Sequence, residues 1–423
     1  MSGSGQGRNR RGQRSLYQLA DGASELRAAL GEPSLLLWAL YIVLFPIYVV
    51  PSGLPQPGEF VAILLSISVV RRWDGKLGPH SKKALRSIGL FLFYALLVNL
   101  AWSLVMGTMQ LNLKDGFLLS PVFYMYNAVI FALGLLMYQR YGERFLWVTV
   151  KMVLITVLVQ VVLSTLVRGV GPRGRGTVMF NNPNQLGYYA VLSASLLFFG
   201  QMRGWLSTVQ TVIGTAACSY LALLSASKAA LVCIVLVIVV GTLNRLRTVL
   251  LIGAVFVAFV FVAEPHLNVI EKASYRIQND RTAGFVEERG YDRIIVHPEY
   301  WLLGSGEGGY RRYAGFGAIG SHELHSSAGT LFFCYGIVGT LLFLAFLVRV
   351  VHGAGLQTAA LLVPAAAYGL SHQGLRFTLL WVLLACVVAI KESNRAMRLA
   401  ALAQRRAAKD AANANAIREG EFA

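Results

Sequence analysis

Charged residues are scarce in this chain. Aspartate, glutamate, lysine and arginine make up 14% of its 423 residues, whereas hydrophobic residues make up 56%. Soluble globular domains carry about 25% charged residues. With a mean hydropathy of +0.58, the chain is too apolar for an ordinary soluble globule. We therefore expect an integral membrane protein.

Cysteines are also few, and they lie apart from one another. Each of the four lies alone within an apolar stretch, without paired spacing. Neither a disulfide framework nor a zinc site follows from such an arrangement. The four cysteines are Cys218, Cys233, Cys334 and Cys386.

Long apolar runs recur along the whole chain, and their length suits helices that cross a bilayer, roughly 17 to 25 residues each. The runs are continuous, so they lack the period-two alternation of membrane barrel strands. The fold class expected is an all-α integral membrane protein with about twelve transmembrane helices and one large outer loop containing short helices. The predicted spans are 34–51, 56–70, 87–107, 118–138, 145–167, 184–200, 205–224, 228–243, 248–263, 327–351, 356–371 and 375–391.

Acidic residues are outnumbered, 20 against 38 lysines and arginines, which gives a formal net charge of +18. The distribution of the basic residues argues against a nucleic-acid partner, because most of them lie in the two terminal segments and in connectors that become cytoplasmic if the N-terminus lies inside. Both termini are then cytoplasmic, and no cleaved signal peptide is expected. The basic residues of these connectors are Arg71, Arg72, Lys76, Lys82, Lys83, Arg86, Arg140, Arg144, Arg203, Arg245, Arg247 and Arg349.

The predicted spans divide the chain into five parts. Residues 1–33 form a cytoplasmic segment in which leucines and an alanine at helical spacing over 15–30 indicate an interfacial helix. Transmembrane helices 1–9 occupy 34–263, an outer loop occupies 264–326, and transmembrane helices 10–12 occupy 327–391. A cytoplasmic tail follows over 392–423. Within the outer loop, a short helix is expected near its start and a second helix that stops near Pro298.

One group of cations departs from this pattern by lying on the outer side. Three of them sit in the glycine-rich connector RGVGPRGRG, and others follow in the remaining outer connectors. Guanidinium groups bind phosphate oxygens through paired hydrogen bonds, and glycine lets an anion approach the backbone closely. The set predicts a site for a lipid pyrophosphate. Its members are Arg168, Arg173, Arg175, Lys228, Arg276, Arg281, Arg289, Arg293 and Arg376, with His325 among them.

Simpler roles exist for the same residues. Outer arginines can contact lipid headgroups or acidic loop residues, and His325 can be a packed or capping histidine. Ser326 or Ser327 is the expected N-cap of the span that follows. His322 and His325 form the stretch HELH, but its spacing differs from the zinc-protease pattern and no third ligand is evident. We therefore expect neither a metal nor another cofactor.

The stretch that begins at His325 reads His-Ser, nine residues, Gly336, two residues and Gly339. It resembles the signature of the O-antigen ligases, His-[Asn/Ser/Gln]-x9-Gly-x-x-[Gly/Thr/Tyr]. Further motifs of the ligase and polymerase superfamily lie in the same order: an arginine before GT…NPN, ending at Asn184, a Ser-x-Ser-basic turn ending at Lys228, and an arginine-containing helix before GSGEGG. The resemblance covers roughly residues 168–391.

The resemblance implies a bacterial inner-membrane glycosyltransferase whose active site faces the periplasm. Such enzymes move polysaccharide from undecaprenyl pyrophosphate onto a sugar hydroxyl of the lipid A core. Matching positions make His325 the catalytic histidine and give Arg175, Lys228 and Arg293 the roles of phosphate-binding cations. Lys228 departs from the family's usual arginine and loses the planar fork.

The outer positions supply the remaining expected pyrophosphate-binding residues, which are Arg173, Arg289, Asn184, His322 and Arg376. The chemistry suits these residue types. A histidine with a pKa near its ordinary value of about 6.5 can act as general base towards a sugar hydroxyl, while cations stabilise the leaving pyrophosphate. The expected reaction is a metal-independent direct displacement with inversion.

Two other functions remain open. A polymerase of the same superfamily would use the same donor and differ only in its acceptor. A transporter for lipid-linked oligosaccharide is less expected, because transporters carry ionisable residues at mid-membrane and often repeated halves. Here the spans are nearly without charge, Lys151 being the main exception, and no internal repeat is evident.

Overall fold

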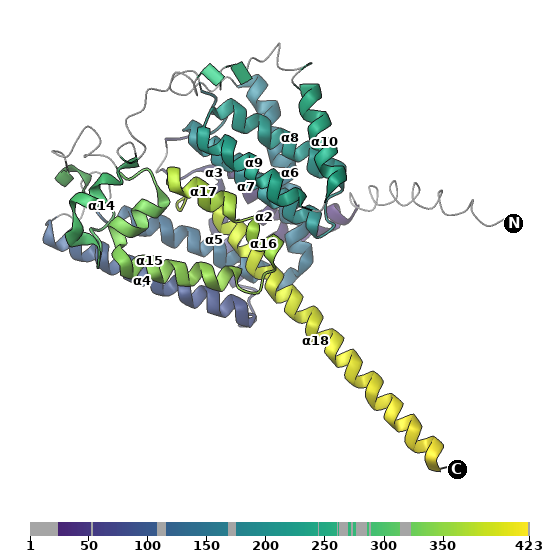
Figure 1. Cartoon of the computed structure of the whole chain (residues 1–423). Coiled ribbons are helices and arrows are strands. Elements are labelled where there is room, and N and C mark those ends of the chain that lie inside the picture. The colour runs from purple at the N-terminus through teal and green to yellow at the C-terminus, as the bar shows by residue number, and fades with distance from the viewer. Residues whose placement is uncertain are drawn as a thin grey trace.

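The computed structural model describes residues 24–51, 54–107, 116–167, 175–243, 245–259, 261, 270–271, 274–275, 286, 289–313 and 323–421. Over these residues the chain folds into helices joined by turns (Figure 1). Five of the described helices are long and apolar enough to cross a membrane. They are α4 (Pro79–Val105), α5 (Leu119–Tyr141), α6 (Glu143–Leu166), α8 (Thr208–Ser225) and α15 (Ser327–Val351).

A short helix, Ser24–Leu30, precedes α2 (Pro33–Leu44) and meets it at an angle of 103°. The pair is long and apolar enough to count as a sixth span if it is taken as one broken segment. The helix expected over residues 15–30 is thus present over 24–30, and residues 15–23 lie outside the described chain.

The other predicted spans are helical but shorter or more polar. They correspond to α3 (Pro57–Val70), α7 (Pro183–Met202), α9 (Lys228–Thr242), α10 (Leu246–Ala258), the pair α16 (Leu356–Ala360) and α17 (Val363–Ser371), and the start of α18 (Thr378–Glu421). Over the described residues, the expectation of an all-helical protein with helices able to cross a membrane is confirmed.

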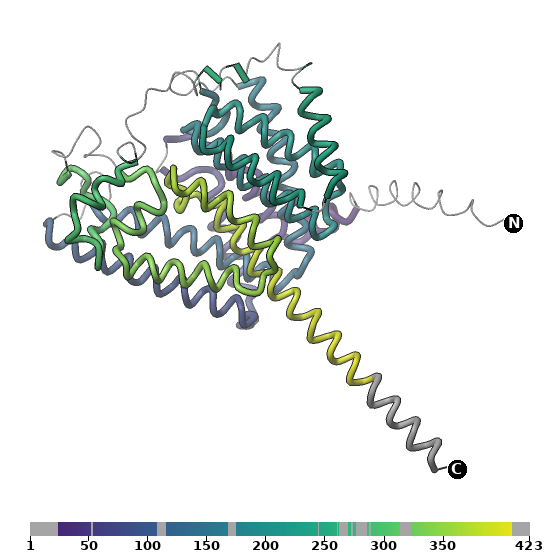
Figure 2. The backbone as a smooth tube through the Cα atoms, viewed as in Figure 1, coloured from purple at the N-terminus to yellow at the C-terminus, as the bar shows by residue number. Residues whose placement is uncertain are grey.

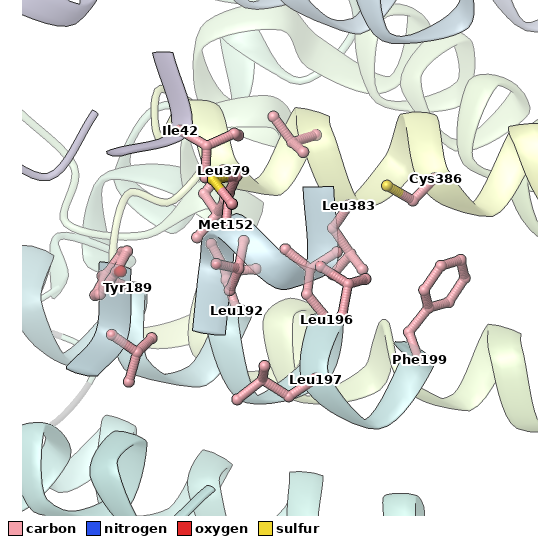
Figure 3. Close-up of a cluster of buried hydrophobic side chains, with 14 of the residues drawn as sticks. Ile42, Met152, Tyr189, Leu192, Leu196, Leu197, Phe199, Leu379, Leu383 and Cys386 are labelled. Carbon is pink, nitrogen blue, oxygen red and sulfur yellow. The ribbon is translucent and has the colours of Figure 1, made fainter. Parts of the chain in front are cut away.

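Helix α7 is the centre of the larger hydrophobic core. It packs against α6, α8, α9 and α18, and nearly all its residues are buried. Leu192 and Leu196 of α7 lie close to Met152 of α6 and to Leu379 and Leu383 of α18 (Figure 3). Since protein surrounds α7 on all sides, it tolerates small and polar residues that a lipid-facing span would exclude.

The second core lies between α4, α5, α15 and α18. Helices α4 and α15 run side by side along one edge of the bundle (Figure 2). Only 28% of the most apolar part of α4 is buried, and Leu90, Phe93 and Leu97 are exposed there. Exposed apolar surface of this extent marks a face for lipid or for a partner.

Helix α15 is interrupted at Gly336, where φ is +63°. The segment after α14 (Asp292–Val296) fits into this break: Ile337 N donates to Trp301 O at 2.7 Å, and Ser305 N donates to Phe333 O at 3.0 Å. A β-carbon on Gly336 would lie 2.4 Å from Leu302 O, so only glycine fits. The break fixes the segment that follows α14 against α15.

Helix α18 is much longer than the predicted final span, since it continues to Glu421 and projects away from the bundle (Figure 1). The segment expected as a cytoplasmic tail over 392–423 is therefore helical over most of its length. Its composition explains this, because alanine, arginine, leucine and glutamine favour helix and no proline interrupts them.

Candidate functional site

A cavity of about 750 Å³ lies where the amino ends of α7, α9 and α15 meet the turn between α17 and α18. Arg175, Lys228 and Arg289 line it, together with the carboxylate of Glu323. Of the described histidines, His325 and His372 line the cavity. These side chains come from sequence positions almost 200 residues apart, so the cavity is a product of tertiary folding.

Hydrogen bonds to the backbone and to a side chain hold Arg175 at the cavity. Its Nε donates to Ser225 O at 2.8 Å, and its Nη2 donates to the Asn184 side chain at 2.7 Å. The following Gly176 donates its N–H to Leu224 O at 2.9 Å, and a β-carbon there would lie 2.4 Å from the Leu224 side chain. The glycine-rich connector therefore approaches the end of α8 closely enough to orient the guanidinium.

The turn between α8 and α9 places Lys228 in the first turn of α9. Ala226 closes α8 in a left-handed conformation, with φ +44°, which is uncommon for a residue other than glycine. Ser227 then becomes the N-cap of α9, and both Ser227 and the exposed Lys228 line the cavity. The cation thus lies beside the amino end of a helix.

His325 precedes α15, whose N-cap is Ser326. The Ser326 hydroxyl accepts a hydrogen bond from Gly329 N at 3.0 Å, which confirms that a serine caps this span. It also lies 2.6 Å from the Tyr291 hydroxyl and donates to Gly369 O at 3.2 Å. The serine of the His-Ser pair therefore fixes the backbone beside the imidazole.

Arg289 and His372 meet within the cavity, with 3.4 Å between Arg289 Nη1 and His372 Nδ1. Burial, and after it the nearby Arg289, His325 and Arg175, lower the pKa of His372 from 6.5 to about 3. His372 is therefore neutral across the physiological pH range. The turn that carries it lies outside the helices α17 and α18.

The electrostatics of the cavity favour an anion. Among the described residues of the lining, the basic side chains of Arg175, Lys228 and Arg289 outnumber the carboxylates, of which Glu323 is one, and Glu323 is paired with Arg376 at 2.9 Å. Residues at the amino ends of α7, α9 and α15 also line the cavity, and such ends carry partial positive charge and N–H donors. The cavity can therefore bind a group with more than one negative charge.

Five of the predicted site residues line the cavity. They are Arg175, Asn184, Lys228, Arg289 and His325. Arg173 and His322 lie outside the described residues, as do Arg168, Arg276 and Arg281.

Two predicted arginines lie away from the cavity lining. Arg293 is 2% exposed, and its guanidinium lies 5.5 Å from the Tyr313 ring centroid. Arg376 forms ion pairs with Glu307, whose side chain is fully buried, and with Glu323. Both arginines therefore contact protein groups. Of the arginines around α14, the one that reaches the cavity is Arg289, one turn before Arg293.

Sequence reasoning did not select several residues that line the cavity. His372 and Gln373 lie in the last turn, and Tyr368 lies one turn earlier on α17. The Tyr368 hydroxyl donates to Asn184 O at 2.7 Å and so joins α17 to the start of α7. A cluster of polar residues between two apolar spans, SHQ at 371–373, is the only sequence signal for these residues.

A comparison of the chain with protein-family models and with curated proteins finds no match. The resemblance to the O-antigen ligases therefore depends on the short motifs, and the cavity geometry is an independent observation. Among the described residues, no group of three or more His, Cys, Asp or Glu side chains is placed to hold a metal ion.

Proposed function

We propose that this protein is a membrane glycosyltransferase of the O-antigen ligase type. It transfers a polysaccharide from undecaprenyl pyrophosphate to a sugar hydroxyl of the lipid A core. The observation that carries the proposal is the cavity in which His325 lies together with Arg175, Lys228 and Arg289. An imidazole beside clustered cations suits a reaction that removes a proton at one oxygen and stabilises a departing diphosphate.

In the proposed reaction, His325 accepts the proton of the acceptor hydroxyl. That oxygen forms a bond to the anomeric carbon, and the bond from this carbon to the phosphate oxygen breaks. The electron pair leaves with undecaprenyl pyrophosphate, whose charge is held by Arg175, Lys228 and Arg289. Attack opposite the leaving group inverts the anomeric configuration. The step needs no covalent enzyme intermediate and no metal.

The proposal also assigns membrane sidedness. With about twelve spans and the basic connectors inside, the cavity faces the periplasm of a bacterial inner membrane and both termini are cytoplasmic. The segment that contains α14 then belongs to a periplasmic loop. Donor and acceptor are both lipids, so a cavity at membrane level gives both access without leaving the bilayer.

The test is transfer by the purified protein in detergent, with an undecaprenyl-pyrophosphate glycan as donor and lipid A core as acceptor. General-base catalysis contributes about 10² to 10⁴ in rate, so His325→Ala is expected to lower transfer by that factor at unchanged melting temperature. His352→Ala is the matched control, because His352 lies at the opposite end of the same helix. Full activity of His325→Ala would refute the assignment.

A polymerase would use the same donor site, so the acceptor decides between the two activities. Loss of a ligase leaves lipid A core without any O-polysaccharide, whereas loss of a polymerase leaves a single repeat attached. A transporter would move the donor without forming a new glycosidic bond. Product formation in detergent, where no membrane separates two compartments, excludes transport as the sole function.

A further inference from the structure

His372 is a second imidazole in the cavity, and the proposed transfer chemistry leaves it without a role. Its position is fixed on several sides. The Tyr368 ring packs against it with 4.8 Å between centroids. Its backbone oxygen accepts hydrogen bonds from Ser327 N at 3.2 Å and from Ser327 Oγ at 3.1 Å. Because Ser327 lies two residues after His325, this contact also fixes the two histidines relative to each other.

The contact with Arg289 determines which ring nitrogen of His372 carries the proton. A guanidinium group donates hydrogen bonds and cannot accept them. Nδ1 of His372, 3.4 Å from Arg289 Nη1, must therefore act as the acceptor. In a neutral imidazole the hydrogen then lies on Nε2. No hydrogen bond to Nε2 is found among the described residues, and this N–H is the polar ring atom left for a ligand in the cavity.

We propose that the Nε2–H group of His372 is a neutral hydrogen-bond donor to a phosphate oxygen of the anion that the cavity binds. This inference rests on the proposed function and assigns one more contact in the same site. His372 is a ligand-binding residue in this assignment, and His325 remains the general base. Arg289 therefore acts in two ways, as a cation in the cavity and as the group that sets the tautomer of His372.

The charge of the surroundings supports the assignment. Arg289, Arg175 and His325 lie near His372, and together with burial they keep it uncharged, with a pKa of about 3. A neutral donor adds a directed hydrogen bond without another positive charge among the existing cations. Glu323, the carboxylate found in the lining among the described residues, is paired with Arg376 and contributes little opposing charge.

The experiment measures binding of inorganic pyrophosphate to the full-length protein in detergent by calorimetry, with melting temperature as the folding control. His372→Phe keeps a ring against Tyr368 but removes both nitrogens. His372→Gln keeps an N–H near the position of Nε2, whereas the shorter amide of His372→Asn reaches only the position of Nδ1. Loss of a hydrogen bond to a charged group weakens binding about tenfold or more.

We expect the Phe and Asn variants to bind pyrophosphate about tenfold more weakly or worse, and the Gln variant to stay within about threefold of the parent. Equal affinity of the Phe variant and the parent would overturn the inference. A Gln variant as weak as the Phe variant would also overturn it. If the parent protein does not bind pyrophosphate, or if Arg175→Ala binds it unchanged, the proposed function fails instead, so the two failures are distinguishable.

Discussion

Replacement of Arg376 by glutamine tests whether this arginine stabilises the fold or binds the ligand. Its guanidinium donates to the side chain of Glu307, which is fully buried, and to Glu323. The Glu307 carboxylate also accepts hydrogen bonds at 2.8 Å from the hydroxyls of Tyr124 on α5 and Tyr335 on α15. Arg376→Gln leaves this carboxylate buried without a counter-charge.

Removal of one partner from a buried ion pair costs about 3 to 5 kcal/mol, because the remaining charge is neither solvated nor neutralised. The Glu323 pair adds little, since that side chain is 34% exposed and pairs of this kind contribute about 0 to 1 kcal/mol. A loss of this size is a large part of the total stability of a protein, about 5 to 15 kcal/mol. Arg376→Gln is therefore expected to melt at a clearly lower temperature.

The assay is thermal unfolding in detergent, followed by pyrophosphate binding of the protein that remains folded. The double variant Glu307→Gln with Arg376→Gln removes both charges and is expected to recover most of the lost stability. Arg395→Gln is the control, because Arg395 is exposed on α18 and its loss should cost less than about 0.5 kcal/mol. If Arg376→Gln melts like the parent but no longer binds pyrophosphate, the structural role argued here is wrong.

Three further changes have defined outcomes. Gly336→Ala is expected to lower the melting temperature, because φ is +63° there and the new β-carbon would lie 2.4 Å from Leu302 O. Gly89 on α4 is the control, because a β-carbon there would meet no atom within 4 Å and Gly89→Ala should leave the melting temperature unchanged. Lys228→Ala is expected to weaken pyrophosphate binding at unchanged melting temperature, since Lys228 is exposed, and Lys228→Arg should retain binding. The pKa of His372 is about 3 in the folded protein, whereas its ordinary value in an unfolded chain is 6.5. Below pH 6.5 the unfolded chain therefore binds a proton that the folded protein does not bind, and stability falls as the pH is lowered towards 3. His372→Gln should lose less stability over that pH range, and an identical loss in both proteins would contradict the assignment.

Much of the helical architecture follows from the sequence. The predicted span 327–351 coincides with α15, and the spans 118–138, 145–167, 184–200 and 228–243 agree with α5, α6, α7 and α9 to within a few residues. Continuous apolar runs give this signal directly, because every backbone polar group in a membrane must be paired within its own helix. The end of α18 was not predicted, since hydropathy marks the apolar part of a helix and carries no information about its polar continuation.

The site was predictable in part. Arg175, Lys228 and His325 stand out because charge is rare in this chain and because they lie in recognisable motifs. Arg293 and Arg376 stand out for the same reason, yet they contact Tyr313 and the pair Glu307 and Glu323 respectively. Charge near the membrane surface therefore identified candidates, but it could not separate cations that face the cavity from cations that pair with protein groups.

The sequence by itself determined that the chain is helical and suited to a membrane, because hydrophobic length and scarcity of charge act locally along the chain. It also determined where the unusual cations and the histidine lie relative to the helix ends. Only the tertiary structure decided which of them share a cavity, since that depends on the packing of α7, α9, α15 and the last turn. It also decided the state of His372, because proton position and pKa depend on neighbours such as Arg289, 83 residues away in the chain.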